Sequence, residues 1–143
     1  MPDVRVPAKG EPGLSLHEIK QFVRNHFEDF VNRKKSEVAL KNFSADFLDH
    51  DEPTGVEVGP EAAKKMMEAT YQRWPDLKVK IEDILAEDDK VVVRNSWTAT
   101  EAATGQMIEF QGFVLWRFAN KKIVERWATI TPPTPIGVKS SRR

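Results

Sequence analysis

The sequence contains no cysteine. Disulfide bonds, thiolate nucleophiles and metal sites held by cysteine are therefore excluded. An excess of either charge is also absent, because 22 lysines and arginines balance 22 aspartates and glutamates. A chain without net charge has no field that would draw nucleic acid or an anionic membrane towards it, so we expect neither as a partner.

Long hydrophobic runs are missing as well, which argues against a signal peptide or a membrane span and predicts a cytoplasmic protein. The first 14 residues hold three prolines and two glycines, and the last 12 combine three prolines with a basic end. We expect both stretches, residues 1–14 and 132–143, to be flexible. Residues 15–131 have the length of one domain with one hydrophobic core.

Capping and periodicity predict three helices in the first half of the chain. Ser15 precedes Glu18 by the spacing of a capping box, and apolar residues then recur at three- and four-residue intervals as far as Val31. A second, short helix is expected from Ser36. A third begins at Pro60, because proline suits the first turn of a helix.

Strand-like segments follow the helices and are separated by turn residues. They cover residues 77–85, 91–100, 106–118 and 122–130. Helices followed by a run of strands predict an α+β fold, in which helices pack on one face of a mainly antiparallel sheet. A three-residue turn at residues 120–122 would place Val114 opposite Ala128 in the last hairpin.

Several short motifs occur in an order that is typical of one family. They are Asp49-His50-Asp51, Trp74-Pro75-Asp76-Leu77, Val91-Val92-Val93-Arg94, Thr104-Gly105 and Ile123-Val124-Glu125-Arg126-Trp127. Through these motifs, residues 15–130 resemble the SnoaL-like polyketide cyclases of the nuclear-transport-factor-2-like superfamily. The resemblance implies a cone-shaped barrel, in which a curved sheet with about three helices on its concave side surrounds a small-molecule pocket. It implies neither a metal nor an organic cofactor.

The resemblance also draws attention to two positions in the last hairpin. In that family an aspartate acts as general acid and base beside a histidine while a ring is closed by aldol chemistry. The corresponding residues here are Ala128 and Val114, and neither side chain can transfer a proton. Two possibilities remain open: the pocket binds its ligand without reaction, or other polar groups carry out the chemistry.

Histidines are the first candidates for such a replacement. His50 lies between Asp49 and Asp51, and a histidine beside carboxylates is a candidate for proton transfer, so we predict it as the catalytic residue. The alternative is a surface or capping histidine. His17 and His26 are predicted on the solvent side of the first helix. Because no inner helix face carries a histidine pair with metal-ligand spacing, we expect no metal site.

Two arginines could supply positive charge to a ligand oxygen. Arg126 shares a strand face with Ala128 and is predicted to line the pocket. Arg94 points inward if a three-residue turn covers residues 103–105, and outward if the turn has two residues. Together they would favour a carboxylate or an enolate. The other predicted pocket residues are aromatic or apolar: Tyr71, Trp74, Trp97, Phe110, Val114, Trp116 and Ala128.

These features predict a protein with a small-molecule pocket. We expect a cofactor-independent lyase or isomerase that acts on a small carbonyl or cyclic compound, without the aspartate and histidine of the family's cyclases. The alternative is a module that binds a ligand without catalysis, or that interacts with protein as a homodimer. In that alternative the outer sheet face, with Leu115, Glu125 and Trp127, forms the interface.

Overall fold

The computed structural model describes residues 10–51 and 59–137. Its helices are α1 (Leu16–Phe27), the π-helix η1 (Glu28–Asn32), α2 (Val38–Asn42) and α3 (Pro60–Arg73). Its strands are β1 (Phe43–Asp49), β2 (Lys78–Glu87), β3 (Lys90–Thr100), β4 (Met107–Ala119), β5 (Lys122–Ile130) and β6 (Thr134–Pro135). The predicted succession of three helices and four long strands is confirmed.

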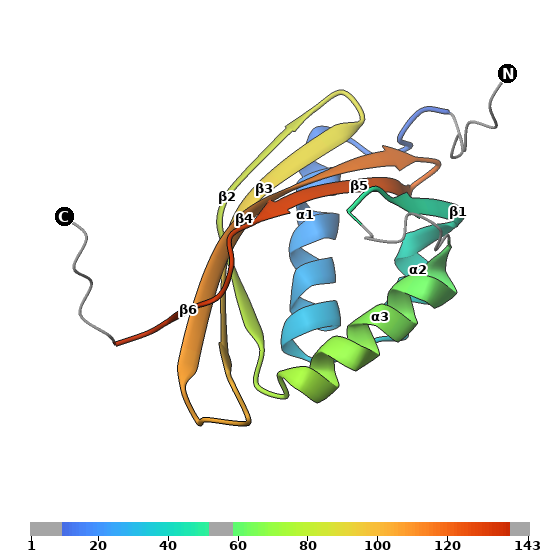
Figure 1. Ribbon diagram of the computed structural model, residues 1–143. Coiled ribbons are helices and arrows are strands. Elements are labelled where there is room, and N and C mark those ends of the chain that lie inside the picture. The colour runs from blue at the N-terminus through green and yellow to red at the C-terminus, as the bar shows by residue number, and fades with distance from the viewer. Residues whose placement is uncertain (1–9, 52–58, 138–143) are drawn as a thin grey trace, which may run out of the picture.

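The strands form one curved sheet in the order β1-β5-β4-β3-β2, with the short β6 paired to β4. β1 runs parallel to β5, and every other pair is antiparallel. Figure 1 shows the sheet bending over α1, while α3 lies across the open side of the cone. The predicted α+β fold, with helices on the concave side of a mainly antiparallel sheet, is confirmed.

Local sequence signals fix the position of the first helix against the sheet. The Ser15 hydroxyl accepts a hydrogen bond from the Glu18 backbone at 3.1 Å, and the Glu18 carboxylate accepts one from the Ser15 backbone at 2.8 Å. This is the predicted capping box. At the far end of η1, the Asn32 side chain accepts from the Val79 N–H and donates to the Val79 carbonyl. These two bonds fasten the end of the first helix to β2.

The β4–β5 hairpin brings together the two positions where the family resemblance expects a proton-transfer pair. Val114 lies opposite Ala128, as predicted. The turn itself differs, because it contains two residues, Asn120 and Lys121, which both have positive φ angles of 52° and 66°. A shift in the pairing just before Phe118 adds the extra residue and restores the predicted register further along the strands.

The β3–β4 hairpin decides where Arg94 points. Thr100 lies opposite Met107, so the connection has six residues, and Arg94 lies opposite Phe113. Both side chains are exposed on the convex face of the sheet. The prediction that Arg94 lines the pocket is therefore wrong, because a change of one residue in register turns every side chain of a strand to the other face.

Residues near both ends of the described chain form backbone hydrogen bonds with the sheet. The carbonyl groups of Glu11 and Pro12 accept hydrogen bonds of 2.8 and 2.7 Å from the backbone of the β4–β5 turn. At the other end β6 adds a short antiparallel strand beside β4. The flexibility expected for residues 1–14 and 132–143 stays a prediction, and residues 1–9 and 138–143 lie outside the described residues.

Candidate functional site

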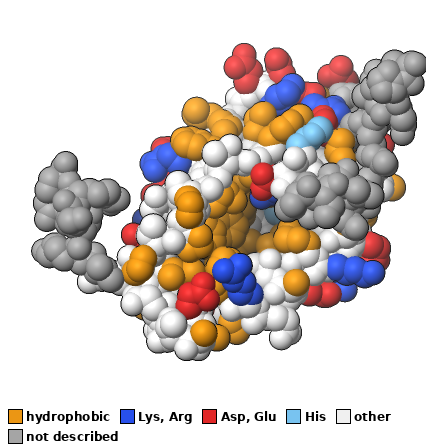
Figure 2. Space-filling model, in the orientation of Figure 1, with side chains coloured by type: hydrophobic (Ala, Val, Ile, Leu, Met, Phe, Trp, Pro, Cys, Tyr) orange, Lys and Arg blue, Asp and Glu red, His pale blue; other side chains and the backbone are white. Residues whose placement is uncertain are grey.

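A small cavity lies between the concave face of the sheet and the helices. Its volume is about 50 Å³. Figure 2 shows a hollow on this side of the molecule with walls of hydrophobic side chains. The apolar lining residues are Phe27, Phe30, Val31, Phe43, Phe47, Ala63, Met66, Met67, Trp97 and Trp116, and the ionisable ones are His26, Asp49 and Arg126. A few polar groups in an apolar, aromatic cavity are the usual composition of a ligand site.

An ion pair closes one side of the cavity. Asp49 ends β1 and Arg126 lies beside it on β5, because the two strands pair in parallel at this point. Nη1 of Arg126 donates to both carboxylate oxygens of Asp49, at 3.0 and 3.1 Å. Only 14% of the Asp49 side chain and 18% of the Arg126 side chain are exposed. In such a setting the two charges stabilise each other, and either one alone would be costly to bury.

His26 approaches the cavity from α1 and is only 2% exposed. Its Nδ1 atom lies 2.8 Å from the side-chain nitrogen of Asn42, and its ring packs against Phe30, Phe43 and Trp116. Burial, and to a lesser extent the positive charge of Arg126, lower the pKa of His26 to about 3. The imidazole is therefore neutral throughout the physiological range.

Two buried nitrogen atoms of cavity-lining residues lack a hydrogen-bond partner among the described residues. They are Nε2 of His26 and Nε1 of Trp116. The third large ring, Trp97, differs because its Nε1 donates to Asn95 Oδ1 at 2.8 Å. Trp74 Nε1 and Asn95 Nδ2 are also unpaired within the described residues, and neither residue lines the cavity. More than nine in ten buried polar groups in proteins have a partner, so an unpaired nitrogen of a cavity-lining residue is a candidate contact for a ligand.

The size of the cavity limits what it can hold. A volume of about 50 Å³ accommodates roughly three or four water molecules, whereas typical ligand pockets measure roughly 300–1,000 Å³. Met66 and Met67 form part of the wall on α3, and methionine side chains adapt their shape easily. The cavity therefore fits a small compound, or one end of a larger compound for which the methionines move.

The sequence matches a family model for SnoaL-like polyketide cyclases over residues 21–131. This match covers most of the chain. The chain belongs to the SnoaL-like polyketide cyclase family.

Solved structures of other SnoaL-like proteins have the same fold. AclR of Streptomyces galilaeus, a proposed hydroxylase, is 29% identical with a TM-score of 0.72, and the match covers 82% of this chain and 81% of AclR. A proposed polyketide cyclase from Bacillus cereus is 28% identical with a TM-score of 0.69, over 85% of this chain and 82% of that one. No match was found among curated proteins.

The SnoaL-like fold brings only part of the predicted pocket to the cavity. Arg126, Trp97 and Trp116 line it. Trp74, Phe110 and Val114 are buried in the surrounding core, and Ala128 packs against that core. The Tyr71 hydroxyl donates to the Phe30 carbonyl and thereby connects α3 to η1. Burial raises the pKa of the Tyr71 phenol. None of these last five side chains is part of the cavity lining described above.

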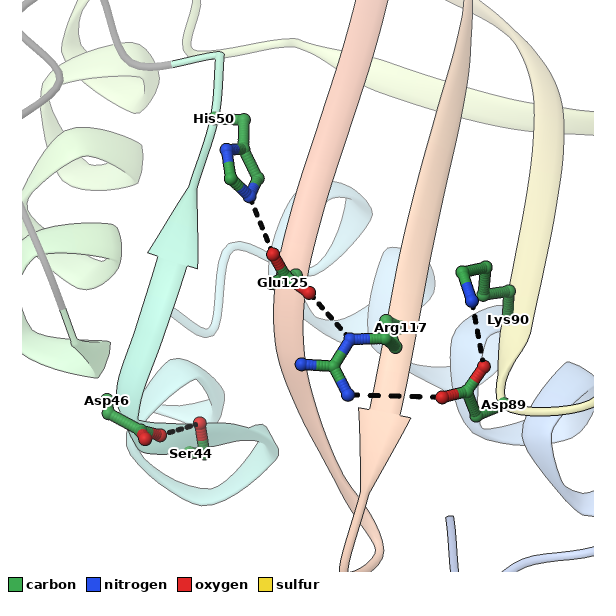
Figure 3. Close-up of polar contacts among 7 residues, drawn as sticks. All are labelled: Ser44, Asp46, His50, Asp89, Lys90, Arg117 and Glu125. Carbon is green, nitrogen blue, oxygen red and sulfur yellow. Dashed lines mark hydrogen bonds and ion pairs between the residues drawn. The ribbon is translucent and has the colours of Figure 1, made fainter. Parts of the chain in front are cut away.

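His50 lies on the convex face and not in the cavity. Its ring stacks on Trp127, with centroids 4.6 Å apart, and its Nε2 atom lies 2.8 Å from the Glu125 carboxylate. Figure 3 shows that the Glu125 carboxylate also accepts a hydrogen bond from Arg117. The guanidinium of Arg117 in turn forms an ion pair with Asp89. The prediction that His50 faces the interior pocket is therefore wrong, because alternation along the extended chain turns Asp49 inward and its neighbour outward.

Arg94 likewise forms an ion pair on the convex face. Its Nε and Nη2 atoms each lie 2.7 Å from Asp83 Oδ2, and 47% of its side chain is exposed. An exposed pair of this kind contributes little to stability. Arg94 cannot contact a ligand in the cavity from this position.

Sequence reasoning missed His26 and Asp49, although a signal for each was present. His26 lies three residues after Val23 and four before Phe30, which puts it on the buried stripe of the first helix. Asp49 lies two residues after the buried Phe47, so it shares the inner face of β1. In both cases the position within the helix or strand indicates burial, whereas the residue type alone suggests exposure.

Two further properties concern the described residues as a whole. Within residues 10–51 and 59–137, no three histidine, aspartate or glutamate side chains gather in a way that could hold a metal ion. None of the helices in these ranges has the length and hydrophobicity needed to cross a membrane.

Proposed function

We propose that this protein binds a small carbonyl compound in the interior cavity and moves a proton on it without a cofactor, as a lyase or isomerase. The observation that carries the proposal is the meeting of Asp49, Arg126 and His26 at one apolar cavity. Proton abstraction beside a carbonyl needs a base, and the anion that forms needs positive charge or hydrogen-bond donors close by. The cytoplasmic location expected from the sequence is part of this proposal.

Asp49 takes the role that the sequence assigned to His50. Among the described cavity-lining residues it is the one carboxylate, and a neutral His26 leaves it as the group best suited to accept a proton. The bond from Arg126 fixes its orientation. Once a proton has moved to Asp49, the guanidinium is free to stabilise the negative charge that develops on the substrate.

The relatives support a small-molecule substrate. Several structures of this fold are described as polyketide cyclases, and AclR is described as a hydroxylase. The ring-closing chemistry attributed to the family requires acid and base side chains. The sequence resemblance assigns Val114 and Ala128 to the positions of that pair, and these two residues lie opposite each other. A different proton acceptor, on β1, accounts for a related reaction in the same fold.

Deuterium exchange tests this proposal directly. The protein is incubated in D₂O with a panel of small ketones, and NMR follows the appearance of deuterium on the carbon beside the carbonyl. Asp49→Asn should abolish enzyme-dependent exchange, whereas Asp83→Asn, which changes a carboxylate on the convex face, should leave it intact. Exchange that persists in Asp49→Asn would disprove the role of Asp49. If a ketone raises the thermal stability of the protein but no exchange occurs, the ligand-binding part of the proposal stands and the catalytic part is refuted.

A second proposal concerns the convex face, which we infer to be the interface of a homodimer. Phe113 is 55% exposed there, and Leu115, Trp127 and Val92 extend the apolar surface across β3, β4 and β5. Apolar residues on an uncovered sheet face are typical of an interface. Phe113→Lys should convert a dimer to a monomer in light scattering after size exclusion. A wild-type monomer at high concentration would refute the dimer.

A further inference from the structure

Two residues from different elements line the cavity and each has an unpaired buried nitrogen. His26 comes from α1 and Trp116 from β4, and their rings meet edge to face with centroids 5.1 Å apart. Each residue is at most 3% exposed, and each keeps one nitrogen without a partner among the described residues. Leaving such a group unpaired costs roughly 1–3 kcal/mol, which gives a suitable ligand a corresponding advantage.

The bond from Asn42 determines which nitrogen of His26 carries the proton. The Asn42 amide nitrogen donates, so Nδ1 of His26 must accept. A neutral imidazole has one proton, which therefore lies on Nε2. The orphan nitrogen of His26 is a donor and not a base.

The indole N–H of Trp116 can also only donate. The cavity-lining residues thus offer two N–H groups to a hydrogen-bond acceptor. Arg126 lies directly opposite Trp116 in the β4–β5 pairing and adds positive charge on the same side. A water molecule could accept these bonds and donate to the Asp49 carboxylate on the cavity wall. A carbonyl or enolate oxygen has acceptor positions and no hydrogens.

We propose that Nε2–H of His26 and Nε1–H of Trp116 together bind the carbonyl oxygen of the substrate and hold the enolate oxygen that forms from it. This rests on the proposed function for the ligand class. Asp49 removes a proton from the carbon beside the carbonyl, the electrons of that C–H bond form a C=C bond, and the C=O electrons move to oxygen. The two donors stabilise this oxygen, and return of the proton reverses the step.

NMR of the ¹⁵N-labelled protein tests the assignment without any substitution. In the free protein, long-range ¹H–¹⁵N correlations should show His26 protonated on Nε2 alone between pH 5 and pH 8. Titration with cyclopentanone should move the Nε2–H and Trp116 indole signals downfield. Methylenecyclopentane, which has the same shape without the oxygen, should not. A His26 proton on Nδ1 would overturn the proposal, and so would His26 and Trp116 N–H signals that do not shift when the ketone is added.

Matched tryptophan variants supply the second test. Trp116→Phe removes one unpaired donor, and its ring can still stack on Phe27. We expect it to lose the preference for cyclopentanone over methylenecyclopentane by roughly tenfold. Trp97→Phe makes the same change at a cavity-lining ring whose donor is already paired, and should keep the preference.

The outcomes separate the two proposals. Equal binding of both compounds to the wild type would reject the donor pair and leave the cavity as an apolar ligand site. Binding of neither compound would reject the carbonyl ligand of the proposed function and the donor pair with it. Loss of the preference in Trp97→Phe as well as in Trp116→Phe would show that packing, and not the orphan donor, sets the selectivity.

Discussion

At the residue scale, the interior is defined by polar groups whose properties come from their surroundings. His26 is an ordinary histidine in sequence, but burial among Phe30, Phe43 and Trp116 keeps it neutral and turns it into a fixed donor. Asp49 and the adjacent His50 differ by one position and have opposite environments. The same charged residue types contribute to the cavity or to the convex face according to which way the strand directs them.

His26 should make the protein sensitive to acid. Its pKa is about 3 in the folded state against an ordinary value of 6.5, so the unfolded chain binds the proton more readily. Stability is then complete above about pH 6.5 and falls with decreasing pH by roughly 1.4 kcal/mol per unit until the folded pKa is reached. Urea unfolding at pH 7 and pH 5 measures this loss. His26→Gln should unfold with a smaller difference between the two pH values, and an unchanged difference would contradict a buried neutral imidazole.

The pair of Asp49 and Arg126 should show strong coupling. Removing either charge leaves the other largely out of water, so Asp49→Ala and Arg126→Ala should each destabilise the fold by roughly 2 kcal/mol. The double variant should lose less than the sum of the two. A double-mutant cycle in urea provides the measurement, and additive losses would mean that the two groups do not interact.

At the element scale, two hairpins determine which side chains face the cavity. In the β4–β5 hairpin, a two-residue turn and a shift in pairing give the predicted register. Between β3 and β4, the six-residue connection gives a register in which the Arg94 side chain points to the convex face. Gly112 lies where β4 comes close to the end of β5. A methyl group there would lie 2.7 Å from Ile130 Cγ1 and 2.8 Å from the Thr129 carbonyl oxygen.

Gly112→Ala should therefore weaken the hairpin. Backbone atoms of β5 cannot move away as a flexible side chain could, so we expect a loss of roughly 1–3 kcal/mol. Gln111→Ala, at the neighbouring exposed position, is the matched control and should change stability by less than about 0.5 kcal/mol. Thermal unfolding compares the two variants. Equal midpoints would show that β5 tolerates the added methyl group.

At the scale of the whole molecule, the cavity exists because a curved sheet and three separate helical segments do not fill the space between them. The sheet supplies Trp97, Trp116 and Arg126, while α1 and α3 close the cone from the other side. The convex face carries a different set of groups. The linked polar contacts of His50, Glu125, Arg117 and Asp89 lie there together with exposed apolar side chains. The two proposals therefore concern different faces: small-molecule binding on the concave side and contact with a second copy on the convex side.

Filling the cavity should separate these tasks. Ala63 lies on its α3 wall, and Ala63→Leu adds enough volume to occupy much of a space of about 50 Å³. We expect thermal stabilisation by cyclopentanone to disappear while the oligomeric state remains that of the wild type. Ala62→Leu, on the preceding residue of α3, is the control. Retained ligand stabilisation in Ala63→Leu would place the binding site elsewhere.

The sequence by itself determined the helices, the strands, their order and the α+β class, because capping boxes, apolar periodicity and turn residues act over a few positions. It also placed Val114 opposite Ala128, although the predicted three-residue turn is a two-residue turn combined with a shift in the pairing. Only the tertiary structure decided that Asp49 and His26, rather than His50 and Arg94, line the cavity. That outcome depends on a parallel contact between β1 and β5 and on the exact register of β3, and both are set by packing between segments that are far apart in the chain.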